Sequence, residues 1–161
     1  MSTHLLWEQY LDTRVEFVDY ESQCWSVEPA ENPDSRWPLM PPAFDRQIEI
    51  AHIITAWNPG SEQLDDEVNR TRNTELRRQL QELGFESAPA IGYGRSDDWS
   101  EESIIVFGAD RAQVVKLAAE HGQNAIFEWT PQDWIVVGVL IDGERQTGWT
   151  CEVLPDRPIY D

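Results

Sequence analysis

Two neighbouring carboxylates, Glu101 and Glu102, begin a β-rich apolar stretch at residues 103–107. Successive strand residues face opposite ways, so one of these side chains points inward and the other outward. An inward carboxylate near Trp99 would be desolvated, which raises its pKa and suits a general acid or base. We take Glu102 as the candidate catalytic residue. No cofactor is expected, although Asp97 and Asp98 with the glutamates offer oxygen ligands for Mg²⁺; the alternative is a solvated acidic hairpin.

Side chains that could bind a ligand occur in three further segments. The turn Asn-Pro-Gly-Ser at 58–61 precedes a predicted helix, whose first N–H groups favour an anion, or it is only a turn and cap. Arg70 could hold a carboxylate or phosphate through two hydrogen bonds, or pair with Glu101 or Glu102. Amides at 123 and 124 suit a nucleobase or sugar edge, or a hydrogen-bonded turn. The predicted ligand-binding residues are Asn58, Ser61, Asn69, Arg70, Glu101, Ser103, Gln123 and Asn124.

The elements that must position these groups follow from hydrophobic periodicity. Strands are predicted at about 47–57, 88–93, 103–107 and 125–129. Helices are predicted at 66–83 and 110–121, the second opened by a capping box of Asp110 and Gln113. The order β-α-β-β-α-β is that of a ferredoxin-like α+β fold, with a core at about 47–129.

The segments before and after this core are expected to belong to the same single domain, which spans residues 1–161. Residues 1–20 contain a predicted helix at 3–12 and a strand at 14–20. Residues 21–46 are rich in proline and tryptophan, so we expect an irregular segment. Residues 130–161 hold a predicted β-hairpin and a tail.

The predicted order brings the polar segments together. A right-handed crossover makes the strands at 47–57 and 88–93 parallel, so both end at the same edge of the sheet. The third strand begins there and the second helix ends there. Asn69 continues the apolar stripe of the first helix, and a buried amide needs a partner, which could be the 58–61 loop, water or a ligand. We therefore expect one rim pocket.

These motifs resemble an uncharacterised bacterial family, the domain of unknown function numbered thirty-two ninety-three in its series. The similar stretches are ITAWNPGS at 54–61, Asn69-Arg70, Trp99 with EES at 101–103, and GQNAI at 122–126. Where such proteins usually carry Glu before the Asn-Arg pair, this chain has Val68, and a proline often found before the Ser103 position is missing. The resemblance implies a fold and a choice of motifs but no reaction.

Composition narrows the classes of partner. The 161 residues include 30 acidic and 12 basic side chains, a net charge of -18. This charge disfavours direct binding to nucleic acid or to an anionic membrane. The start has no basic region, and the longest apolar run, 135–141, is far shorter than a membrane helix needs, so we expect a cytoplasmic location. The three histidines and two cysteines lack zinc-site spacing, and no metal site is assigned.

Two functional hypotheses remain open. The preferred one is a domain that binds a polar, anionic or nucleotide-like small molecule in the rim pocket, with or without hydrolysing it. The alternative is an acidic interaction or inhibitor protein, a nucleic-acid mimic that covers the basic surface of a protein partner. The acidity could also reflect only a salty cytoplasm.

Overall fold

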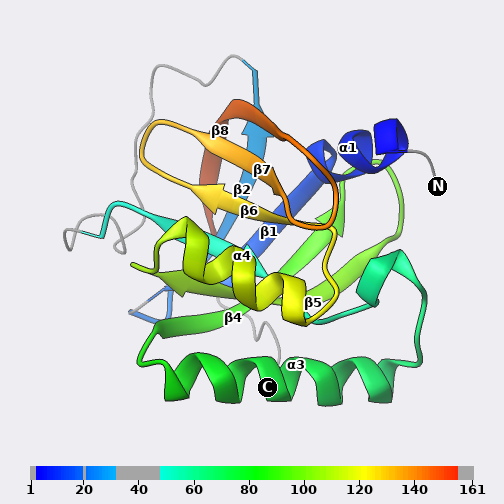
Figure 1. The fold of residues 1–161 in the computed structure, drawn as a ribbon. Helices are drawn as coiled ribbons and strands as arrows, with labels where there is room; N and C mark the ends of the chain where they lie inside the picture. The colour runs from blue at the N-terminus through cyan, green and yellow to red at the C-terminus, as the bar shows by residue number, and fades with distance from the viewer. Residues whose placement is uncertain (1–2, 20, 32–47, 156–161) are drawn as a thin grey trace.

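The computed structural model describes residues 3–19, 21–31 and 48–155, and its centre is a closed barrel of antiparallel strands (Figure 1). Around the barrel the order is β1-β2-β8-β7-β6-β3-β5-β4, and β4 closes the ring by pairing with β1. The strands are β1 (Thr13–Val18), β2 (Cys24–Ala30), β3 (Ala51–Ile54), β4 (Glu86–Gly94), β5 (Ser100–Phe107), β6 (Ala125–Trp129), β7 (Trp134–Gly138) and β8 (Glu144–Leu154).

Helices lie outside the barrel. The long helix α3 (Asp66–Glu82) and the shorter α4 (Arg111–Glu120) cover the strands β3, β5 and β6, with α3 along the bottom of Figure 1. Leu76 and Leu80 of α3 are fully buried there, as are Ile104 and Val106 of β5. The predicted capping box of Asp110 and Gln113 is confirmed at the start of α4. The remaining helices are α1 (Thr3–Leu11) and the short 3-10 helix η1 (Pro59–Ser61).

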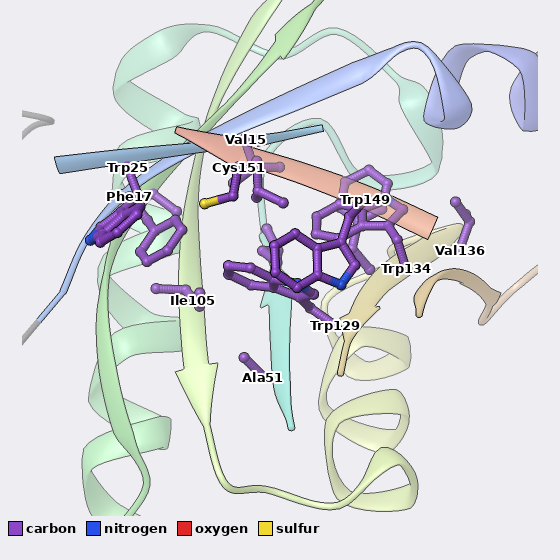
Figure 2. Close-up of a cluster of buried hydrophobic side chains, with 14 of the residues drawn as sticks. Val15, Phe17, Trp25, Ala51, Ile105, Trp129, Trp134, Val136, Trp149 and Cys151 are labelled. Atoms are coloured by element: carbon purple, nitrogen blue, oxygen red, sulfur yellow. The ribbon is translucent and has the colours of Figure 1, made fainter. Parts of the chain in front are cut away.

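Large aromatic side chains fill one part of the barrel interior (Figure 2). Trp129 packs edge-on against both Phe17 and Trp149, with ring centroids 5.4 and 5.1 Å apart. Phe127 stacks on Trp134 at 5.1 Å. Edge-to-face and offset stacked rings pack favourably, so this cluster closes the interior toward the ends of β1 and β6.

The predicted ferredoxin-like fold is wrong, because the sheet does not stop at its four core strands. β1 and β2 before them and β7 and β8 after them complete a barrel. The physical reason lies in residues 104–107 and 125–129, which are buried on both faces of their strands. Helices α3 and α4 cover only the outer face, and the inner apolar face is covered by the other strands.

Residues 21–46 were expected to be irregular, and this is incorrect for the part that forms β2. β2 pairs with β1 on one side and β8 on the other. Pro29 lies beyond the pairing with β1, which extends only to Val27, and is matched with Trp149 of β8. The rest of the expected irregular segment, residues 32–46, lies outside the described residues.

Candidate functional site at one mouth of the barrel

A pocket of about 580 Å³ opens at the mouth of the barrel where β1, β5 and β6 begin and β3 and β4 end. We call it the mouth pocket. α1 and the loop with η1 lie beside it, on the right of Figure 1. Eight of the nine predicted site residues line it, from β5, α3 and the loops after β3 and α4: Asn58, Ser61, Arg70, Glu101, Glu102, Ser103, Gln123 and Asn124. The ninth, Asn69, is fully buried beside it.

The mouth is hollow because the inward-facing side chains of β1 and β6 become smaller toward this end of the barrel. On β1 the inward sequence from the mouth is Thr13, Val15, Phe17, and on β6 it is Ala125, Phe127, Trp129. On β5 it is Glu101, Ser103, Ile105, Phe107, and on β4 the mouth position is Gly92. Since small residues cannot fill a barrel of this size, a cavity remains above the aromatic cluster.

Glu101 is the most unusual group in the mouth pocket. Alternation with Ile105 and Phe107, which belong to the interior cluster, directs its side chain inward. Its side chain is half-buried, and among the described residues no cation pairs with it. Burial raises the pKa of this carboxyl to about 8, against an ordinary value of 4.5. Glu101 is therefore protonated at neutral pH and can donate a hydrogen bond.

Tyr10 of α1 covers the pocket, although no motif in the sequence marked it. Its ring and that of Phe127 pack edge to face with their centroids 6.1 Å apart, and its hydroxyl is hydrogen-bonded to Asn124 and Ser61. Asn124 Nδ2 also donates to Ser61 Oγ at 3.0 Å. Burial, with the charge of Glu101, raises the pKa of Tyr10 to about 12. The phenol thus stays neutral, and these polar atoms converge from three distant segments.

Glu102, the predicted catalytic residue, lies at the rim of the mouth pocket and points toward α3, outside the barrel interior. Its carboxylate lies 3.6 Å from Arg70 Nε, and Arg70 Nη2 lies 3.9 Å from Asp66 Oδ2. Arg70 is 61% exposed, so this is a rim ion pair with water around it. The property expected of an inward glutamate, a raised pKa in an apolar setting, belongs to Glu101.

Two asparagines of α3 hold the loop that follows β3. Asn69 Nδ2 donates to Asn58 Oδ1 at 2.7 Å, and its Oδ1 accepts from the Asn58 N–H at 2.9 Å. Asn73 Oδ1 accepts from the Ala56 N–H at 2.7 Å, and its Nδ2 donates to the Glu102 carbonyl at 2.8 Å. The hydrogen-bond partner that these buried amides require is thus the loop after β3 itself, and Asn69 positions Asn58.

The loop after α4 is held in the same way. Gln123 Nε2 donates to the Trp57 carbonyl at 3.1 Å, and the Gly60 N–H donates to the Gly122 carbonyl at 2.7 Å. Gly122 has φ +71°, and a Cβ there would come within 2.9 Å of the Pro59 Cβ. The turn at 58–61 is therefore clamped between α3 and the end of α4, with its polar side chains at the pocket rim.

Neither a metal-binding cluster nor a membrane-spanning helix occurs in the described part of the chain. In residues 3–19, 21–31 and 48–155, no three His, Cys, Asp or Glu side chains gather in a way that could bind a metal ion. None of the helices described combines the length and the apolarity needed to cross a bilayer.

Comparison with known sequences confirms the family resemblance. Residues 54–126, a little under half of the chain, match the family described as Protein of unknown function (DUF3293). This region runs from the end of β3 into β6 and contains the loops and the β5 glutamates of the mouth pocket. No curated protein and no solved structure matches the chain.

Proposed function

We propose that this protein binds a small polar molecule in the mouth pocket. The single observation behind this is the cavity itself, which combines an aromatic floor with carboxyl, hydroxyl and amide groups from separate segments. Ligand sites in proteins have volumes of about 300–1,000 Å³ and a few convergent polar groups on apolar walls. The mouth pocket has a volume in this range and polar groups that converge from separate segments.

The charges of the pocket bear on the kind of molecule. The carboxylates of Asp66 and Glu102 line it together with the protonated Glu101, and Arg70 is the one cation among its lining residues. Arg70 already lies beside two carboxylates, and the whole chain carries a net charge of -18. An anion entering this field meets repulsion. These charges favour an uncharged or cationic ligand over the anionic or nucleotide-like one expected from the sequence.

Tryptophan signals test the proposal with a small set of chemically different probes. Trp57 and Trp99 are among the residues that line the mouth pocket. Trp25 Nε1 donates to Asp19 Oδ2 and Trp149 Nε1 donates to the Thr130 carbonyl, both at the opposite end of the barrel. Titration with AMP, glucose 6-phosphate, glucose and tyramine should move the Trp57 and Trp99 indole N–H resonances with at least one probe. The Trp25 and Trp149 resonances should stay in place.

A variant that fills the pocket provides the control. Ser103→Met extends a flexible side chain from β5 into the mouth and should abolish the shifts. Thr74→Met places the same side chain at an exposed site on α3 and should leave them unchanged. The proposal is wrong if no probe moves the two mouth resonances, or if Ser103→Met leaves the shifts intact.

A further inference from the structure

We infer that the ligand of the mouth pocket is an organic amine, whose ammonium group lies against the Glu101 carboxylate while its carbon skeleton rests on the aromatic wall. This inference rests on the proposed function and specifies the class of ligand. It is carried by the inward carboxyl, by the acceptor atoms around it and by the aromatic lining.

The first step concerns the carboxyl. The titratable or charged groups that line the pocket around Glu101 come from α1, α3, β4 and β5: Tyr10, Asp66, Arg70, Tyr93 and Glu102. The only cation of this set, Arg70, lies with the carboxylates of Glu102 and Asp66. Glu101 therefore has no cationic partner among the described residues, and a buried carboxylate needs one to remain ionised. A bound ammonium group would provide it.

The second step concerns hydrogen bonding. An ammonium group has three donors and no acceptor, so its site must present several oxygens. Next to Glu101 lies Tyr10, and its hydroxyl is bonded to Ser61 and to Asn124. Because Asn124 Nδ2 donates to Ser61 Oγ, these side chains retain oxygen lone pairs at the pocket surface. These oxygens beside Glu101 provide the acceptors that an ammonium group needs.

The third step concerns the aromatic wall. Trp99 lies against the inner face of the barrel at Gly92, where a Cβ would contact its ring at 3.7 Å. Tyr10, Trp57 and Phe127 are further aromatic residues of the lining. Ring faces attract cations and stack on flat apolar groups. The pocket thus matches an amine with a flat apolar skeleton.

Isosteric probes test the class of ligand. Tyramine and tryptamine should bind, whereas tyrosol and tryptophol, with a hydroxyl group in place of the ammonium group, should bind at least about tenfold more weakly. Glu101→Gln keeps the shape of the protonated side chain and should weaken amine binding by about tenfold or more. Glu120→Gln removes a carboxylate at an exposed site on α4 away from the pocket and should change amine binding by less than about twofold.

Proton release gives a second readout that a structural role would not produce. With a pKa of about 8, Glu101 is mostly protonated at pH 7 in the free protein, and an ammonium group should drive off a large part of this proton on binding. Calorimetry of tryptamine binding in phosphate and Tris buffers measures this release, which should be absent in Glu101→Gln and with tryptophol.

The outcomes separate this inference from the proposed function. If the alcohols move the Trp57 and Trp99 resonances as strongly as the amines, or if no proton is released, the amine class is wrong while the mouth pocket remains a binding site. If neither amines, alcohols nor the other probes move these resonances at about 10 mM, both proposals are wrong.

Discussion

Glu101 and Glu102 are neighbours in the sequence, yet their carboxyl groups lie on opposite sides of the barrel wall. Glu101 points into the mouth with no cation beside it among the described residues, and Glu102 lies 3.6 Å from Arg70 of α3. The alternation of side chains along β5 produces this separation. Glu101 is thus available to a ligand in the barrel, and Glu102 forms an ion pair between β5 and α3.

This arrangement predicts a pH-dependent stability that depends on Glu101. The unfolded chain ionises this carboxyl near pH 4.5, whereas the folded protein keeps it protonated up to about pH 8. The free energy of unfolding should therefore fall between these values, by at most about 1.4 kcal/mol per pH unit and by less where pocket water solvates the ion. Urea unfolding should give similar stabilities for wild type and Glu101→Gln at pH 5 and a more stable variant at pH 8.

Glu102→Gln is the matched control for this experiment, because it removes the same charge from the rim. Its stability relative to wild type should show no comparable rise from pH 5 to pH 8. An equal difference between wild type and Glu101→Gln at both pH values would contradict a buried, protonated Glu101.

Gly122→Ala should destabilise the clamped turn at 58–61. At φ +71° the new Cβ is strained, and it would also approach the Pro59 Cβ to 2.9 Å. We expect a loss of about 2–3 kcal/mol in urea unfolding. Gly84→Ala has a similar φ of +80° with open space around it, and should cost only about 1 kcal/mol. Equal losses of unfolding free energy in the two variants would show that the close approach to Pro59 does not contribute to the effect of Gly122→Ala.

Asn73→Ala tests whether the buried amides of α3 hold the loop after β3. The variant loses hydrogen bonds to the Ala56 N–H and to the Glu102 carbonyl and leaves both backbone groups without these partners. We expect a loss of about 3 kcal/mol by chemical denaturation. The adjacent Thr74→Ala, at an exposed position, should stay within about 0.5 kcal/mol of wild type. A loss below about 1 kcal/mol at Asn73 would count against this role.

Glu128→Gln tests the charged cluster between the barrel and α4. Glu128 accepts two hydrogen bonds from Arg111, at 2.9 and 2.6 Å, and lies 3.0 Å from His52 Nε2. Burial alone would raise the pKa of this carboxyl, but the hydrogen bonds from Arg111 and His52 outweigh it and lower the pKa. Its stabilising effect is therefore present above its unfolded pKa and lost as the pH falls. The variant should lose about 2–3 kcal/mol at pH 7.

The stability difference between this variant and wild type should shrink as the pH falls below about 4.5, because the unfolded chain then binds the proton more readily than the folded protein, in which the pKa of Glu128 is lowered. Burial also lowers the pKa of His52, so the folded state keeps this ring neutral, and acidification below about pH 6.5 destabilises both proteins through it. Glu120→Gln, at an exposed site on α4, serves as the control with little change. A constant difference between Glu128→Gln and wild type from pH 7 to pH 3 would contradict the lowered pKa of Glu128.

The sequence alone was sufficient to predict the helices and strands near the site and the directions in which they run. β3 and β4 run the same way because each is antiparallel to β5, and both end at the mouth, as the predicted crossover required. Helical spacing identified Asn69 as a buried amide in need of a partner. Both inferences depend on local hydrophobic periodicity and on the direction of the chain. Short stretches of sequence are enough to indicate these two features.

Only the tertiary structure decided how the sheet closes and which groups enter its interior. The pairing of β1 with β4 joins residues about eighty positions apart, and no local pattern selects that partner. Closure brings Tyr10 over the pocket and turns Glu101, rather than Glu102, toward the interior. Side-chain alternation told us that the two glutamates would differ, but the inside of a barrel exists only once its last strands have paired.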